Sequence, residues 1–442
     1  MKNQTAVLKP SLIATALAVA FAAANPAQAQ TAKDFEDMRQ EIKRLRDEVN
    51  ALKQAAPTSA ASAASAKPTD TSGWGERIEQ LEIKAKDAVV LGDIGGGFRL
   101  PGSETSVRLY GYAEANLIHD FKGFGKPDNF TNLPSQPLDN AGTPKGRTKL
   151  TAETSRFGFE TSTPTGVGTF NTKLEMDFYA YDGGRNRLRL RHAYGEYAGW
   201  LIGQTWSTFM DLDNLPETVD FNGPIGAPFS RRTMIRYTYA DAKAGNKFTI
   251  ALEDPEDQFG GGSANEKMPQ LVARFDKTFG WGAVNARVLA HEKRSVLESG
   301  ASQTKRGFGF GVGASYKLTD KDVLMGQYTR VDGDVDQLYG SNGYAIDTTT
   351  GAISFDKNQG LVLGYAKTFS DQLRGTVVLG LNRGKSAQAL DNRSLTQFHL
   401  GMIYSPLKNV ELGGELIMGK RKNFNDETGT LTRFDLMGRY SF

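Results

Sequence analysis

A row of basic side chains stands in the middle of the chain, where arginine recurs at every second position. Its members are Arg185, Arg187, Arg189 and Arg191. Alternate residues of an extended strand share a face, so the last three would form a ladder of guanidinium groups, with Leu188, Leu190 and His192 on the other face. On a lipid-facing surface each guanidinium would cost about 2–4 kcal/mol near the membrane midplane, so the ladder is expected to face water. Arg232 and Arg236 share a face of a later segment and would extend it.

The chemistry open to such a ladder is the recognition of anions. Guanidinium groups bind carboxylates through paired hydrogen bonds, so a water-filled lumen lined by them would prefer anionic solutes. An alternative stays open, in which the ladder pairs with inward acids such as Glu175 and Asp177 and only stiffens the wall.

A second charged segment, 209–230, carries four acids and no basic residue. The acids are Asp211, Asp213, Glu217 and Asp220. Three prolines restrict its backbone, which favours an ordered loop. A loop folded into the lumen would narrow the channel and set its acids opposite the arginine ladder, creating a transverse field. The alternative is a surface lid without a constriction.

Strands are the elements that must position these charges. A two-residue hydrophobic alternation runs from about residue 105 to Phe442, typical of strands with one apolar and one polar face. It predicts sixteen strands, at about 105–119, 147–162, 167–181, 187–197, 198–208, 231–240, 246–254, 268–279, 281–294, 304–318, 321–333, 356–369, 371–384, 393–405, 407–422 and 428–442. Links are short at one end and usually longer at the other, and lipid cannot satisfy an open sheet edge. The predicted fold class is therefore all-β, a transmembrane sixteen-stranded antiparallel barrel with a polar lumen and periplasmic termini.

The front of the chain predicts export. Residues 1–29 have two lysines, a short apolar run and an Ala-x-Ala site, which together indicate a signal peptide rather than a membrane anchor. Residues 30–54 carry a three-heptad apolar seam from Phe35 to Leu52 with charges flanking it, which predicts a periplasmic coiled coil. An amphipathic helix lying on another surface is the alternative. Residues 55–104 form an Ala/Ser/Pro linker with a short helical or irregular stretch, and 105–442 the barrel.

Catalytic signals are scarce. The four histidines lie far apart in sequence without ligand spacing, and no G-x-S-x-G motif occurs. Gly307, Gly309, Gly311 and Gly313 read as one small-residue face of a strand rather than a nucleotide loop. We therefore expect no catalytic residue, no cofactor and no metal, and the protein is not predicted to be an enzyme. The net charge of +3 argues against a nucleic-acid partner.

Several short motifs together resemble one family. They are Arg108 to Tyr112 (RLYGY), Thr154 to Gly158 (TSRFG), Leu188 to Tyr194 (LRLRHAY), Gly203 to Ser207 (GQTWS) and Asp220 to Pro224 (DFNGP). In this order, and with the coil and the spacer before them, they resemble the DcaP-like porins of Gram-negative bacteria. The resemblance implies a trimer, uptake of small anions such as dicarboxylates, and a constriction built from the third loop and barrel arginines. A trimer also suits the segment where Trp200, Ile202, Gln204 and Trp206 would share one outward face.

The sequence thus favours an outer-membrane porin, a passive diffusion channel for small hydrophilic solutes that prefers anions. The expected partners are a second and third copy of the chain, outer-membrane lipid or lipopolysaccharide, and small dicarboxylates. The coil would add a periplasmic or peptidoglycan contact. The alternative is a structural barrel that tethers the envelope through its coiled coil.

Overall fold

The computed structural model describes residue 44 and residues 90–123, 130–140, 146–182, 185–255 and 266–442. The chain divides into two compact units, Met1–Glu79 and Gln80–Phe442. The predicted signal peptide, the predicted coiled coil and most of the predicted linker lie outside the described residues, so the barrel unit alone is considered below.

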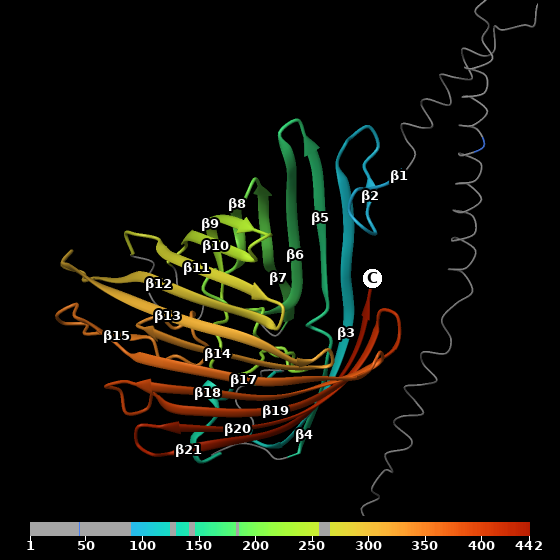
Figure 1. The fold of residues 1–442 in the computed structure, drawn as a ribbon. Helices are drawn as coiled ribbons and strands as arrows, with labels where there is room; N and C mark the ends of the chain where they lie inside the picture. The colour runs from blue at the N-terminus through green and yellow to red at the C-terminus, as the bar shows by residue number, and fades with distance from the viewer. Residues whose placement is uncertain (1–43, 45–89, 124–129, 141–145, 183–184, 256–265) are drawn as a thin grey trace, which may run out of the picture. The chain divides into compact units, whose positions relative to one another are not determined.

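The barrel unit consists of strands that pair with their neighbours in chain order (Figure 1). The barrel strands are β3 (Ser106–Lys122), β4 (Arg147–Thr151), β5 (Arg156–Thr165), β6 (Gly168–Asp182), β7 (Arg185–Tyr197), β8 (Trp200–Trp206), β9 (Arg231–Asp241), β10 (Asn246–Glu253), β11 (Gln270–Phe279), β12 (Gly282–Val296), β13 (Ser302–Thr319), β14 (Asp322–Asp332), β17 (Lys357–Ser370), β18 (Leu373–Lys385), β19 (Asn392–Leu407), β20 (Val410–Asn423) and β21 (Thr428–Ser441). The smaller elements are β1 (Val90–Leu91), β2 (Phe98–Arg99), η1 (Leu133–Ser135), η2 (Leu138–Asn140), β15 (Tyr344–Ile346) and β16 (Ile353–Phe355).

The sheet closes on itself because β21 pairs antiparallel with β3. Both β4 and β5 pair with β3 and so share one crossing, while β1 and β2 are a short extension beside the start of β3. Of the nineteen strands in the sheet, sixteen crossings of the wall therefore remain. The predicted sixteen-stranded antiparallel barrel is confirmed, and each predicted span overlaps one crossing.

The two faces of the wall differ as the alternation predicts. On β19, Leu400 and Met402 point outward and are 47% and 45% exposed, whereas the inward Gln397 and His399 are 1% and 0% exposed. Large apolar side chains cover the outside on strand after strand. In water this surface would be costly to solvate, but it suits the hydrocarbon of a bilayer.

The links at the two ends of the barrel have different lengths. At one end the turns are as short as Ala198-Gly199, whose φ angles of 49° and 85° are both positive, as a type I′ hairpin turn requires. The other end carries the long connections, which we number L1 (123–146), L3 (207–230) and L6 (333–356). Short turns face the periplasm in outer-membrane barrels, so the long loops are outside.

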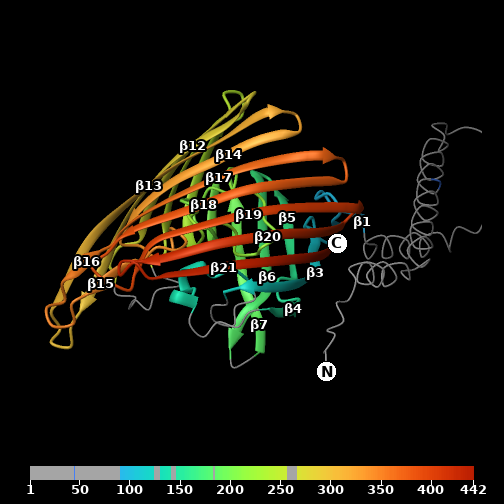
Figure 2. The same cartoon turned by 90° about the horizontal axis from the view of Figure 1, so that it is seen from below.

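L3 lies against the inner surface of the barrel on a bed of glycines. A Cβ atom on Gly364 of β17 would come within 2.6 Å of the Pro216 ring, and one on Gly309 of β13 would lie 3.1 Å from Phe209 Cζ. Ordinary contacts between carbon atoms are about 3.5–4.0 Å, so these positions leave no room for side chains. The alternating glycines predicted as a small-residue strand face thus make space for the loop, whose Phe209 and Ile225 are fully buried. Figure 2 shows β12, β13, β14 and β17 to β21, which include these strands, running side by side as one wall.

Candidate functional site

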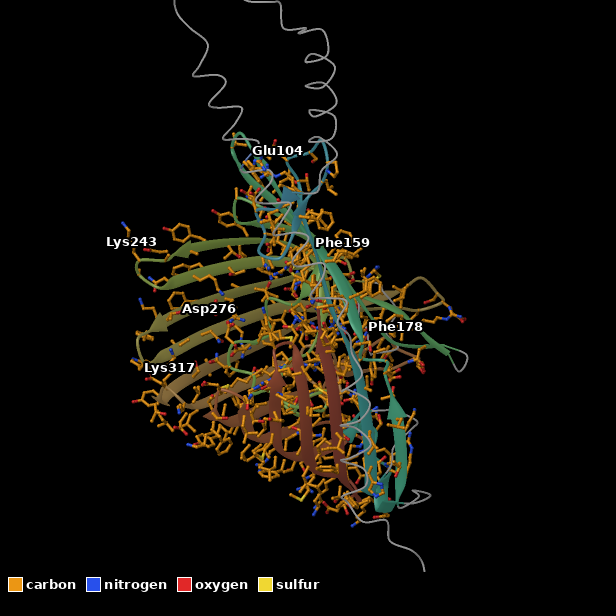
Figure 3. The ribbon with its side chains drawn as sticks, turned by 90° about the vertical axis from the view of Figure 1, so that its right-hand side faces the viewer. Glu104, Phe159, Phe178, Lys243, Asp276 and Lys317 are labelled. Carbon is orange, nitrogen blue, oxygen red and sulfur yellow. The ribbon has the colours of Figure 1, made fainter. Side chains whose placement is uncertain are left out.

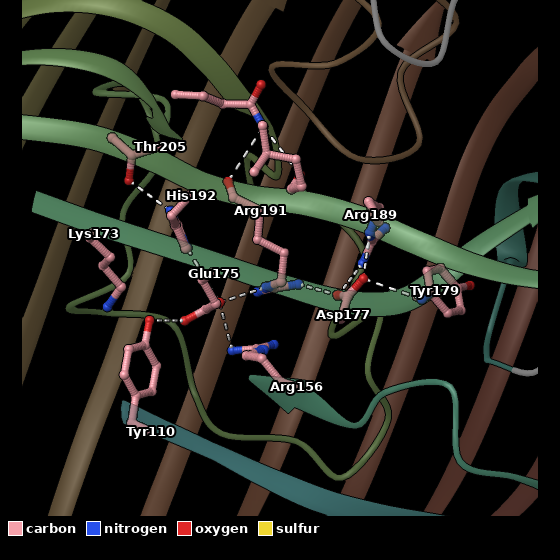
Figure 4. A network of polar contacts seen from close by, with 12 residues as sticks. Tyr110, Arg156, Lys173, Glu175, Asp177, Tyr179, Arg189, Arg191, His192 and Thr205 are labelled. Carbon is pink, nitrogen blue, oxygen red and sulfur yellow. Dashed lines mark hydrogen bonds and ion pairs between the residues drawn. The ribbon is translucent and has the colours of Figure 1, made fainter. Parts of the chain in front are cut away.

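The arginine row meets a pair of carboxylates on the neighbouring strand (Figure 4). Arg189 donates Nε and Nη2 to the two oxygens of Asp177, at 2.9 and 2.7 Å. Arg191 bridges both acids, with Nε 2.8 Å from Glu175 Oε1 and Nη1 2.8 Å from Asp177 Oδ2. The pairing with Glu175 and Asp177 that the sequence left open as an alternative is therefore present. These bonds hold two guanidinium groups in fixed positions.

A β-bulge changes the phase of the row. Glu175 is opposite His192 and Met176 is opposite Leu190, so Arg191 is the extra residue of β7. Arg191 and His192 are both buried, and His192 Nδ1 lies 2.9 Å from the Thr205 hydroxyl. The expectation that His192 shares the outward face is wrong, because simple alternation does not continue through a bulge.

Two further arginines join this wall, and neither was singled out from the sequence. Arg156 Nη1 on β5 lies 3.4 Å from Glu175 Oε1, and the guanidinium of Arg231 at the start of β9 stacks 4.5 Å from the centre of the Trp206 ring. Trp206 also contacts the guanidinium of Arg191, at 5.6 Å. Its expected place on an outward face is therefore wrong, because β8 ends at Trp206 and the alternation ends with it. The TSRFG motif around Arg156 was the available signal.

We call Arg156, Arg189, Arg191 and Arg231 the basic wall. Three of these guanidiniums, those of Arg156, Arg189 and Arg191, share the two carboxylates Glu175 and Asp177, so guanidiniums outnumber carboxylates in this group. A low-dielectric protein wall screens such an excess less than water does, so its field extends into the neighbouring solvent.

The side of L3 that meets the basic wall is aromatic. The Phe221 ring centre lies 5.6 Å from the Arg189 guanidinium and 5.7 Å from that of Arg191, and Tyr179 of β6 packs 5.0 Å from Phe221. A cavity of about 490 Å³ opens beside this contact. Its lining includes Tyr179, Arg189, Trp206, Phe221, Arg231 and Tyr339. The cavity thus combines cationic groups and flat apolar faces with one acid, Asp336, which pairs with Arg232.

The acids of L3 point to the other side of the lumen. Asp213 pairs with Arg274 of β11 at 2.9 Å, and Glu217 pairs with Arg374 of β18 at 2.8 Å. Asp211 lies 3.7 Å from the same Arg274. The expectation that these three acids face the arginine ladder is wrong, because the wall under the loop supplies its own arginines.

Asp220 also anchors the loop. Its carboxylate accepts hydrogen bonds from the backbone and hydroxyl of Thr131 in L1, at 2.9 and 3.0 Å. Its own amide donates to Glu415 Oε2 of β20, at 2.7 Å. The loop is therefore tied to L1 and to the wall at a buried residue that is 1% exposed.

The other predicted arginines are scattered. Arg187 is exposed near the outer end of β7, and the side chain of Arg185 lies outside the described residues. Arg232 is 1% exposed and pairs with Asp336 of L6 at 3.0 Å. Arg236 lines a second cavity of about 480 Å³ nearer the short turns, 3.9 Å from Glu196. The structure brings Arg189 and Arg191 together and separates them from Arg232 and Arg236.

A family model of the DcaP outer membrane protein matches residues 99–442. The chain belongs to the DcaP outer membrane protein family. It is similar to the crystal structure of the outer membrane channel DcaP of Acinetobacter baumannii, with a TM-score of 0.71 and 29% identity over 78% of this chain and 99% of that one.

More distant relatives of this DcaP-family chain share parts of it. Porin Omp2b of Brucella canis is 29% identical over 231 residues, which is 48% of this chain and 57% of Omp2b. An anion-selective porin from Comamonas acidovorans has a TM-score of 0.52 at 15% identity, covering 77% of this chain and all of that one, a likeness of fold alone.

In this DcaP-family barrel, L6 braces both ends of L3. Gln337 Nε2 donates to the Ser207 hydroxyl, at 3.2 Å, and Gln337 Oε1 accepts from the Ser230 hydroxyl, at 3.1 Å. The same amide reaches Gln270 Oε1 on β11, at 3.1 Å. All four side chains are buried, so a single glutamine holds the first and last turns of L3 relative to the wall.

In the described ranges of the DcaP-family chain, no helix has the length and hydrophobicity of a membrane span. In the same ranges, no group of three or more histidine, aspartate or glutamate side chains has an arrangement that could hold a metal ion.

Proposed function

We propose that this protein is a passive diffusion channel of the outer membrane for small hydrophilic solutes, with a preference for anions such as dicarboxylates. The observation that carries the proposal is the basic wall, in which Arg156, Arg189 and Arg191 share the two carboxylates Glu175 and Asp177 on the lumen side of a closed barrel. The relationship to the Acinetobacter baumannii protein, described as an outer membrane channel, supports the channel function.

The proposed constriction lies between the basic wall and L3. The loop packs on the inner surfaces of β13 and β17, so it takes up part of the lumen cross-section. Its own acids bind Arg274 and Arg374 on the side away from the basic wall. An anion passing between the two surfaces would therefore meet guanidiniums on one side and Phe221 on the other, without facing carboxylates of equal number.

The paired carboxylates have a use in this scheme. Glu175 and Asp177 keep Arg189 and Arg191 extended in fixed positions, so a solute carboxylate does not have to order flexible side chains when it binds. They also reduce the net charge, which keeps the site from holding an anion too tightly. A channel needs binding strong enough for entry and weak enough for release.

The test is the ion selectivity of purified protein in a planar bilayer. In a KCl gradient the wild type is expected to give stepwise currents whose reversal potential favours chloride, and succinate is expected to compete with chloride. The double variant R189A/R191A removes two guanidiniums and keeps Glu175 and Asp177, so its preference for anions should fall strongly. A matched control is R393A/K422A, which removes two cations that pair with Asp426 near the outer rim.

Two results would refute parts of this proposal. If folded protein inserts into the planar bilayer and gives no stepwise current, it is not a diffusion channel. A reversal potential in R189A/R191A equal to that of R393A/K422A would show that the basic wall does not set the anion preference.

We also infer a homotrimer. On the outward face of β8, Trp200 and Ile202 are 51% and 63% exposed, and the polar Gln204 follows them. Gln204 Nε2 donates to the Leu190 carbonyl, at 3.2 Å. The remaining polar atoms of the amide would still fit a protein neighbour better than hydrocarbon, since lipid offers them no hydrogen-bond partner. Cross-linking in native membranes should capture three copies, and a monomeric species alone would contradict the inference.

A further inference from the structure

Four basic side chains form a cluster on the outside of the barrel, which we call the outer basic cluster. Its members are Arg330 on β14, Lys357 on β17, and Arg383 and Lys385 on β18. These strands are direct neighbours, as Figures 1 and 2 show, and all four residues occupy outward positions of the alternation. The cluster therefore lies on the membrane side of the wall and has no part in the lumen.

The cluster stands where the apolar surface ends. Leu361 is paired with Leu381 across β17 and β18, both pointing outward, and the next outward pair is Gln359 with Arg383. The pair after that is Lys357 with Lys385. On β18 the outward apolar positions run from Leu373 to Leu381, about 20–25 Å of membrane height at the usual strand rise and tilt. The cationic positions therefore begin at the level of lipid headgroups, on the side of the long loops.

The charges of this cluster are not balanced within the described residues. Lys357 and Lys385 are directly opposite on adjacent strands, an arrangement of like charges that destabilises a sheet. One carboxylate is near, since Asp332 lies 3.4 Å from Arg330 Nε and is the cross-strand neighbour of Lys357, so four cations stand against one acid. Within the ranges that the structure describes, Lys357, Arg383 and Lys385 have no ion-pair partner. An anion bound between these strands would remove the repulsion.

We propose that the outer basic cluster binds the phosphate groups of lipopolysaccharide in the outer leaflet. The site combines two features that such a lipid requires. Arg330 and Arg383 can bind phosphate through paired hydrogen bonds, and the lysines add compact positive charge. Directly below, Leu361, Leu363 and Leu381 present an apolar surface for acyl chains. A soluble phosphate would use the first feature and not the second.

The test measures lipid A binding to detergent-purified full-length protein by native mass spectrometry and by the shift in unfolding temperature. The variant is K357A/R383A/K385A. Each basic residue near an anionic lipid surface contributes roughly a fivefold factor, so the affinity for bisphosphorylated lipid A should fall about 100-fold. The matched control, K243A/K317A/K321A, removes three exposed lysines at the short-turn end, where Figure 3 labels Lys243 and Lys317. It should bind as the wild type does.

Lipid A without phosphate should bind the wild type weakly, with the affinity that bisphosphorylated lipid A has for K357A/R383A/K385A. The single-channel conductance of this variant should equal that of the wild type. The proposed site would be overturned if the control K243A/K317A/K321A lost as much affinity for bisphosphorylated lipid A, or if K357A/R383A/K385A bound this lipid as tightly as the wild type. Inorganic phosphate that stabilises the protein as much as bisphosphorylated lipid A would overturn the assignment to a lipid.

Discussion

An alanine at Gly364 is expected to push L3 away from the barrel wall. The added Cβ would lie 2.6 Å from Cβ and Cγ of Pro216, about 1 Å closer than two carbon atoms approach at rest. Pro216 belongs to a rigid ring, so the loop backbone has to move rather than a flexible side-chain tip. Overpacking of this kind costs about 1–3 kcal/mol. We expect G364A to lower the free energy of unfolding by that amount and to narrow the path between L3 and the basic wall.

The matched control is G414A on β20. A Cβ at Gly414 meets nothing closer than Leu436 Cδ2 at 3.5 Å, which is an ordinary contact. Both variants change glycine to alanine inside a strand, so the backbone effect is similar. The assays are denaturant unfolding and single-channel conductance in a planar bilayer. G364A should be less stable and conduct less than G414A, and equal values in both assays would show that L3 does not rest on the glycine bed.

Two further perturbations act on the outer loops. Q337A removes the amide that braces both ends of L3, and the buried Ser230 hydroxyl loses its acceptor, at a cost of about 1–3 kcal/mol, while Ser207 keeps its bond to Glu253. Compared with the exposed-site variant Q359A, Q337A should show larger current fluctuations, and equal noise in the two variants would contradict the brace. In L6, burial raises the pKa of Asp356 to about 6, with Asp391 nearby contributing. Because the folded pKa exceeds the usual 3.8, the stabilisation is full below about pH 4 and is lost as pH rises through 6, at most about 3 kcal/mol. Protection factors for hydrogen exchange in L6, which are corrected for the intrinsic pH dependence of amide exchange, should therefore fall between pH 4 and 7 in the wild type. The same fall in D356N would refute this assignment.

The fold followed from sequence because the membrane enforces one rule along the whole barrel. Outward positions within the apolar band must suit lipid and the sheet cannot have an open edge, so the alternation that places Leu400 and Met402 outside recurs from strand to strand. The lengths of the turns predicted which end of the barrel faces outside. The family motifs agreed with the predicted barrel and with this orientation. These are local patterns, readable from neighbouring residues without knowledge of tertiary contacts.

The site was harder to predict, because its decisive contacts are not local. The position of His192 depends on a bulge, which inserts one residue and reverses the phase of the strand. The partners of the L3 acids are remote in sequence, since Arg274 is 61 residues from Asp213 and Arg374 is 157 residues from Glu217. A count of charges in the loop shows its acidity, but only the closed barrel shows which wall neutralises it.

This arrangement changes how selectivity has to be understood. An acidic loop facing a basic wall would orient a dipole without favouring either sign of charge strongly. Here the wall under the loop supplies Arg274 and Arg374, which form ion pairs with the loop acids Asp213 and Glu217. The negative charges of these two acids are therefore largely neutralised where the loop meets the wall. The opposite surface keeps more guanidiniums than its carboxylates can match, and Phe221 adds no charge across from it. In the proposed channel, the potential along the path would then be one-sided and positive, which is the condition for attracting anions rather than only orienting them.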